Sequence, residues 1–91
     1  MNNPYVVVRT YSAGVHVGEL VERNGKEVRL ANARRIWSWE GANTLHEIAT
    51  AGVSAGSKVS VSVAMIDLTE AIEIIHCSEA GERSLRAAKW S

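Results

Sequence analysis

Residues 15–31 read VHVGELVERNGKEVRLA, and this stretch decides the fold. Apolar and polar residues alternate on both sides of Asn24-Gly25, and alternation with a period of two predicts β-strands. Asn-Gly between two such segments is the strongest short-range hairpin signal, because both residues tolerate the positive φ of a type I′ turn. We therefore predict a β-hairpin with a two-residue turn at Asn24-Gly25.

This turn sets the register of the predicted hairpin. It pairs Arg23 with Lys26, Val21 with Val28, and Glu19 with Leu30. One face then carries the apolar residues of a core, which are Val17, Val21, Val28 and Leu30. The opposite face carries His16, Leu20, Glu22, Glu27 and Arg29.

Further strands are predicted before and after the hairpin. Residues 5–11 are β-branched and aromatic, and residues 33–40, 58–68 and 69–77 alternate. In residues 33–40, one side of the strand carries Arg35, Trp37 and Trp39, and the other carries Arg34, Ile36 and Ser38. In residues 58–68, Val59, Val61, Val63 and Met65 share a side.

One helix is predicted near residues 44–51. Thr44 and Glu47 have the spacing of a capping box, and Gly52 is a natural stop. A second, short helix is predicted around residues 82–88. Five or six short strands with one inserted helix indicate the α+β class. We expect residues 1–91 to form a single domain built on a small curled antiparallel sheet or an open barrel.

Composition restricts the function. Ten basic and ten acidic residues cancel, so the overall field that attracts a protein to long nucleic acid or to an anionic membrane is missing. The single cysteine, Cys77, cannot form an internal disulfide. The chain begins without the basic start and apolar run of a signal peptide. These features predict a protein of a reducing cytoplasm.

No catalytic or metal site is predicted. The three histidines, His16, His46 and His76, lie thirty residues apart, and no pair has metal-ligand spacing. Cys77 follows His76 directly, and neighbours on a strand point to opposite faces. Ser12 and His16 could meet through a loop, but no third orienting group accompanies them. We therefore expect a protein that is not an enzyme, without metal or cofactor.

Residues 34–39, RRIWSW, are the densest chemical signal. Arg34 and Arg35 offer bidentate donors for phosphate, while Trp37 and Trp39 offer flat faces on which a base can stack. The alternative is that both tryptophans are core or interface anchors. Both interpretations hold if a site forms at a subunit contact, with Tyr11 as a third aromatic wall.

The segment Ser12-Ala13-Gly14 is a second candidate. Its backbone N–H groups could form an anion-binding nest, although a simple turn explains the same residues. Together with His16, these residues complete the predicted ligand-binding set. That set consists of Tyr11, Ser12, Ala13, Gly14, His16, Arg34, Arg35, Trp37 and Trp39.

The runs VVVRTYSAGVHVGEL, NGKEV, ANARRIWSWEGANTLHEIA and LTEAIEII together resemble a family of small proteins of tailed bacteriophages and prophages, known only as a domain of unknown function. The resemblance covers residues 5–77 and implies a phage accessory protein in the cytoplasm of the bacterial host. Small phage proteins of this kind often counter host defence. The resemblance thus favours a sponge that sequesters a nucleotide immune signal.

The leading hypothesis is a homo-oligomer that holds a small nucleotide, for example a cyclic oligonucleotide, near subunit contacts. Two alternatives stay open. One is a protein-interaction module that inhibits a host factor or serves phage assembly. The other is a binder of single-stranded nucleic acid that uses the same aromatic side chains.

Overall fold

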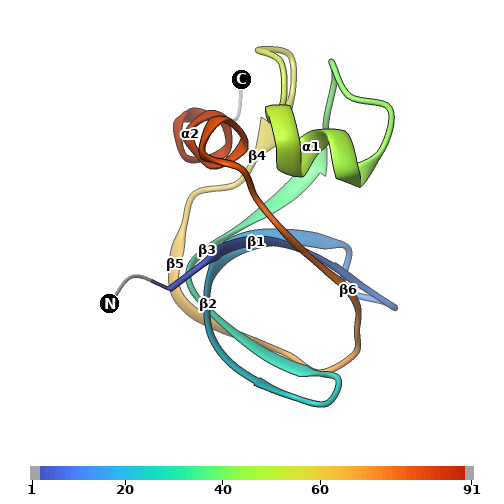
Figure 1. Cartoon of the computed structure of the whole chain (residues 1–91), viewed down its shortest axis with the longest axis vertical. Helices are drawn as coiled ribbons and strands as arrows, with labels where there is room; N and C mark the ends of the chain where they lie inside the picture. Colours follow the sequence, from blue (N-terminus) through green and yellow to red (C-terminus); the bar gives the residue numbers. More distant parts are fainter. Residues whose placement is uncertain (1–2, 90–91) are drawn as a thin grey trace.

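The computed structural model describes residues 3–89 and shows an α+β fold with an open, curled antiparallel sheet, as predicted (Figure 1). The strands are β1 (Tyr5–Thr10), β2 (Val15–Asn24), β3 (Glu27–Ser38), β4 (Lys58–Val59), β5 (Val63–Leu68) and β6 (Ala71–His76). The helices are α1 (Leu45–Ala51), between β3 and β4, and α2 (Glu79–Ala87), after β6.

The strand order is β4-β3-β2-β1-β6, and β5 also pairs with β3. The long strand β3 pairs with β5 along its first part and with β4 near its end. This length lets the sheet bend into the ring seen in Figure 1. Strands β5 and β6 follow each other closely, yet β5 pairs only with β3 and β6 only with β1 among the described strands. The ring is therefore open between β5 and β6.

The hairpin of β2 and β3 is present, but the predicted turn and register are wrong. The turn lies one residue later, so Asn24 pairs with Glu27 and Arg23 with Val28. Gly25 has a φ of 63°, whereas Lys26 has no positive φ. A positive φ at the first central residue alone is the pattern of a type II′ turn, rather than the predicted type I′.

Bulges in the hairpin also change its faces. An irregularity between Leu20 and Glu22 turns Leu20 towards the interior and leaves Val21 exposed, so their predicted places are exchanged. A bulge adds one residue to one strand and reverses the alternation beyond it. A second irregularity, next to Gly18, separates Val17 from the face that carries Leu30.

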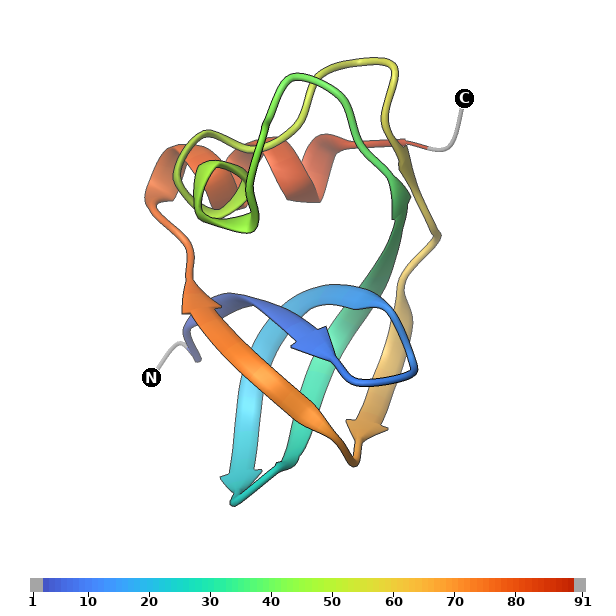
Figure 2. The same ribbon diagram turned by 90° about the vertical axis from the view of Figure 1, so that its right-hand side faces the viewer.

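The sheet has a core on each side. Between the sheet and the helices, β1 and β2 pack against Ile48 of α1 and Leu85 of α2. Inside the curl, β1 packs against β3 and Leu68 of β5. Residues 5–8 are consequently all buried, because β1 has a core on both faces. Figure 2 shows the two helices together on one side of the curled sheet.

Both helices are present. In α1, the Thr44 hydroxyl accepts a hydrogen bond from the Glu47 N–H, and the Gly52 N–H donates to the carbonyl of Ile48. Helix α2 begins earlier than predicted, because the Ser78 hydroxyl accepts from the Gly81 N–H and caps it.

The strand predicted at residues 58–68 is two strands. Strand β4 ends at Val59, which is buried. The next residue, Ser60, is still hydrogen-bonded to β3. Here the Ser60 hydroxyl accepts from the Arg35 N–H, and the Ser60 N–H donates to the Arg35 carbonyl. The predicted shared face is therefore broken, and Val61, Val63 and Met65 are exposed.

Candidate functional site

The adjacent arginines Arg34 and Arg35 lie on opposite faces of β3. Arg34 pairs with Val17, which belongs to the core beneath the helices, and Arg35 pairs with His16 on the other face. Alternation along a strand requires this separation. The predicted pair of phosphate clamps is therefore divided between two environments.

The guanidinium of Arg34 donates hydrogen bonds to backbone carbonyls. Its Nε donates to the carbonyl of Ser60 at 2.8 Å, and its Nη1 donates to the carbonyls of Leu85 at 2.7 Å and Arg86 at 3.1 Å. Its Nη2 donates to the carbonyls of Val59 and Ala88. All five guanidinium N–H groups thus have acceptors, and Arg34 caps the C-terminus of α2, where cations are favoured.

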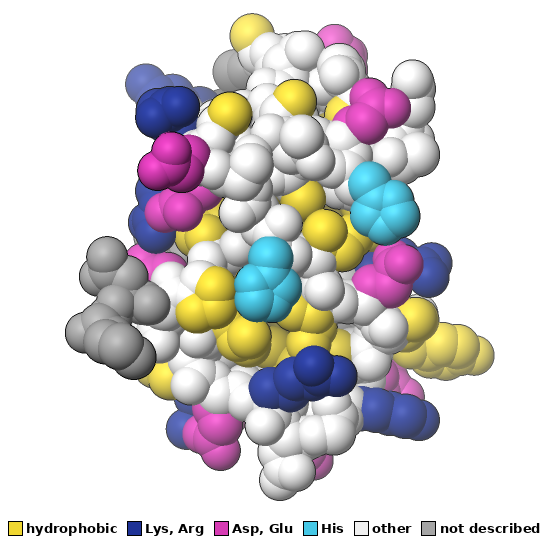
Figure 3. Space-filling model, in the orientation of Figure 1, with side chains coloured by type: hydrophobic (Ala, Val, Ile, Leu, Met, Phe, Trp, Pro, Cys, Tyr) yellow, Lys and Arg dark blue, Asp and Glu magenta, His cyan; other side chains and the backbone are white. Residues whose placement is uncertain are grey.

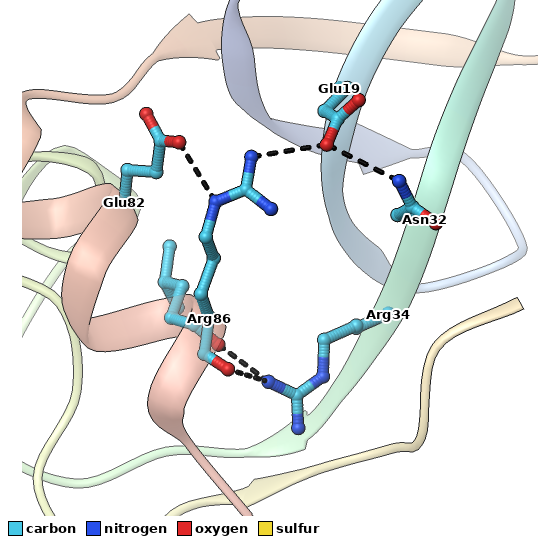
Figure 4. A network of polar contacts seen from close by, with 6 residues as sticks. Glu19, Asn32, Arg34, Glu82 and Arg86 are labelled. Carbon is cyan, nitrogen blue, oxygen red and sulfur yellow. Dashed lines mark hydrogen bonds and ion pairs between the residues drawn. The ribbon is translucent and has the colours of Figure 1, made fainter. Parts of the chain in front are cut away.

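A polar network extends this contact from α2 to the sheet (Figure 4). Arg86 pairs with Glu82 of α2 at 2.8 Å and with Glu19 of β2 at 3.1 Å. The Arg86 guanidinium also lies 4.5 Å from the ring centroid of Tyr5. Burial raises the pKa of Tyr5 to about 12, so its phenol is protonated at neutral pH. Through these contacts, Arg34 and Glu19 fix α2 against the sheet.

Arg35 has no such role. Within residues 3–89, no hydrogen bond or ion pair engages its guanidinium, and the side chain is exposed. The guanidinium lies close to Gly14, since a Cβ built on Gly14 would be 3.0 Å from Arg35 Nη2. The loop between β1 and β2 therefore lies against the end of the Arg35 side chain, at a residue whose φ of 83° favours glycine.

His16 lies beside Arg35 and is almost completely buried, with 5% of its surface exposed. Its Nδ1 has no hydrogen-bond partner among the described residues. Burial and then the charge of Arg35 lower the pKa of His16, so the imidazole is neutral at neutral pH. A buried polar atom without a partner is costly, and the residue paired with His16 across the strands is Arg35, whose guanidinium also has no partner among the described residues.

The loop after β1 is held by its own hydrogen bonds. The Ala13 N–H donates to the Thr10 hydroxyl, which donates to the Gly14 carbonyl, and Gly14 has a φ of 83°. The Ser12 hydroxyl donates to a carboxylate oxygen of Glu70 at 3.0 Å. Ser12 and the Ala13 N–H are thus engaged within the protein in this geometry.

The tryptophans are also divided. Trp37 is 64% exposed, whereas Trp39 packs against the core beneath the helices. Strict alternation predicts both on one side, but the register shifts between Ile36 and Ser38 and turns Trp39 inwards. Trp39 therefore fits the interpretation as a core anchor, whereas a stacking role for Trp37 stays a prediction.

The predicted residues form three groups. Arg35, His16 and Gly14 lie together at one end of the sheet, on the face away from Arg34, and the exposed Trp37 follows two residues after Arg35 on β3. Tyr11 is 77% exposed and lines a separate hollow of about 290 Å³ with Lys26, Glu70, Ala71 and Ile72. Arg34 and Trp39 belong to the helix side. The sequence did not single out Lys26 or Glu70, because nothing in the pattern places the turn before β6 beside Tyr11.

Residues 3–89 contain no group of three or more histidine, cysteine or acidic residues arranged to hold a metal ion. Burial raises the pKa of the Cys77 thiol to about 11, so the thiol is protonated at neutral pH and a poor nucleophile.

No described helix has the length and apolar character needed to span a membrane.

A family model for a domain of unknown function, DUF6948, matches residues 3–85. The chain belongs to this family. No curated protein and no solved structure matches it. The match spans nearly the whole chain and assigns no ligand or reaction to it.

Proposed function

We propose that this DUF6948 protein binds a small nucleotide without transforming it, at the end of the sheet formed by Arg35, His16, Gly14 and Trp37. The observation that carries the proposal is that Arg35 and His16 are partners across β3 and β2, and that neither the Arg35 guanidinium nor the buried His16 Nδ1 has a hydrogen-bond partner among the described residues. A phosphate would pair with the guanidinium. A neutral imidazole beside it can also donate a hydrogen bond from one ring nitrogen to the same ligand.

Trp37 supplies the second half of nucleotide recognition. Its exposed indole lies two residues after Arg35 on β3, so both side chains extend from the same strand. Stacking of a base on an aromatic side chain contributes about 1–3 kcal/mol. Tyr11, on the separate hollow beside Lys26 and Glu70, offers a second exposed ring for a base.

Neutral net charge favours a compact ligand over a long polyanion. Acidic and basic side chains are interspersed on the face in Figure 3, with hydrophobic groups between them. Long nucleic acid usually requires a continuous basic surface. The resemblance to phage proteins adds a biological setting, in which the ligand is a cyclic nucleotide signal of bacterial defence and the protein is a sponge in the host cytoplasm.

Calorimetry against a panel of cyclic mono-, di- and trinucleotides and ADP-ribose derivatives tests the proposal. We expect one class to bind with a Kd of about 1 µM or tighter, and chromatography to recover that ligand unchanged. Arg35→Met and Trp37→Ala should each weaken binding about tenfold or more. Arg23→Met, at an exposed arginine near the hairpin tip, is the matched control and should bind normally. Absence of binding across the panel at about 100 µM protein would overturn the proposal.

A further inference from the structure

Strand β5 carries an apolar strip that the monomer leaves uncovered. Val61, just before the strand, is 83% exposed, and Val63 and Met65 are about half exposed. These residues alternate, so the strip lies along one side of the segment. The side chains on the other side of β5, Ile66 and Leu68, pack inside the curl. One side of β5 therefore belongs to the core, and the other faces solvent.

One edge of β5 is also unpaired. The strand pairs regularly with β3 from Val63 to Leu68, and its residues make no other backbone hydrogen bonds within residues 3–89. Figures 1 and 2 both place β5 at the margin of the molecule. An open edge presents a row of unpaired donors and acceptors to another strand.

The sequence of β5 lacks the features that protect such edges. Proteins block open edges with proline, lysine, inward charges or bulges. Strand β5 reads VAMIDL, and its one charge, Asp67, is paired with Arg29 of β3 at 2.7 Å. The other open edge, β6, carries Glu73 and pairs irregularly with β1 near Arg9 and Thr10. Of the two edges, β5 is therefore the less protected against pairing with another strand.

We infer that β5 is the contact between two copies of this chain, which pair antiparallel across their β5 edges around a two-fold axis. An antiparallel pair of identical strands is self-complementary, as a two-fold contact requires. The apolar side chains of the two strips then become cross-strand neighbours on one face of the joined sheet, where such pairs stabilise each other. Because the chain has no net charge, two copies do not repel each other at long range.

The choice of a second copy follows from charge as well as from shape. Anionic membranes and nucleic acid attract basic surfaces, and the strip offers three apolar side chains and a neutralised Asp67. A homodimer also remedies the small core of a short chain. The inference specifies the homo-oligomer that is expected from the sequence, and its evidence is independent of any ligand.

Analytical ultracentrifugation between about 1 µM and 1 mM protein tests the inference. We expect a dimer of twice 9.9 kDa that dissociates on dilution. Met65→Lys should raise the dimer Kd about tenfold or more, since lysine opposes edge pairing and each dimer would bring two like charges into the paired strands. Ile72→Lys, on β6, is the matched control, because Ile72 and Met65 are equally exposed at 51%. It should leave the dimer Kd within about twofold of the wild type.

Circular dichroism should show that both variants stay folded. A monomeric wild type at the highest concentration, or equal weakening by the two lysine variants, would overturn the inference. The nucleotide proposal would survive that result, because its calorimetry does not require a dimer. Conversely, a dimer that binds no nucleotide would leave the β5 contact intact.

Discussion

Arg34 and Arg35 are consecutive in the chain, but β3 places them in opposite environments. Arg34 points to the helix side, where its five N–H groups donate to backbone carbonyls of residues 59–60 and of the end of α2. Arg35 points to the other face, where no described residue pairs with its guanidinium. The same side chain therefore stabilises the fold at one position and is available for a ligand at the next.

The strongest test of this contrast is to remove each guanidinium in turn. Arg34→Met leaves several carbonyls at the end of α2 without a donor, and hydrogen bonds from charged donors contribute about 1.5–3 kcal/mol each where water cannot replace them. Because the site is half-buried and water can recover part of this, we expect a loss of about 2–4 kcal/mol in the free energy of unfolding. Urea denaturation followed by circular dichroism measures it.

Arg35→Met is the internal control for that experiment. It removes an exposed guanidinium without protein partners, so the free energy of unfolding should change by less than about 0.5 kcal/mol. Equal losses for the two variants would mean that the carbonyl contacts of Arg34 contribute little. The contrast between the two arginines would then not hold.

The next test concerns the close approach of Gly14 to Arg35. Gly14→Ala and Gly25→Ala both place a side chain at positive φ, at 83° and 63°, so each should destabilise the fold by about 1 kcal/mol. Only the new Cβ at position 14 meets a neighbour, at 3.0 Å from Arg35 Nη2, whereas nothing lies within 4 Å at position 25.

Nuclear magnetic resonance separates the two glycine variants. The Arg35 Nε–H resonance should move in Gly14→Ala, because the guanidinium must shift to admit the methyl group. It should keep its position in Gly25→Ala, which shares the backbone strain alone. An unchanged resonance in both variants would show that Arg35 does not rest against the loop.

Local patterns in the sequence were sufficient for the element types. The Asn-Gly signal, the capping box and the alternating segments predict the hairpin, α1 and the curled antiparallel sheet, because each depends on residues close together in the chain. Bulges were not predictable in this way. The irregularity at Val21 exchanges the places of Leu20 and Val21, and the one after Ile36 turns Trp39 inwards, since one extra residue reverses the alternation beyond it.

The candidate site was predictable only in part, for the same reason. Alternation alone separates Arg34 from Arg35, and that separation follows once residues 33–40 are taken as a strand. The Arg34 guanidinium donates to carbonyls at the end of α2, and Leu85 is 51 residues later in the chain. No local pattern indicates this contact. The contact of Ser12 with Glu70 likewise joins segments that meet only in the folded sheet.

The smallest effect is expected from pH, through His16. Its folded pKa is lowered, so below about pH 6.5 the unfolded chain binds a proton that the folded chain resists. The contribution of neutral His16 is complete above that pH and is lost as the pH falls from 6.5 towards the folded pKa. The free energy of unfolding should therefore decrease from pH 7.5 to pH 5.5, and less so in His16→Gln. His46→Gln, at an exposed histidine, should retain the wild-type decrease.

The pKa of His16 also distinguishes the two arginines. Burial and the charge of Arg35 lower the pKa of His16, and Arg34 is not among the causes. Arg35→Met should therefore raise the pKa of His16 towards its ordinary value, whereas Arg34→Met should leave it unchanged in the folded protein. A titration of the His16 ring proton by nuclear magnetic resonance measures both. If Arg34→Met shifted that pKa as much as Arg35→Met, the two faces of β3 would not be electrostatically separate, and the division between a structural and an available arginine would have to be abandoned.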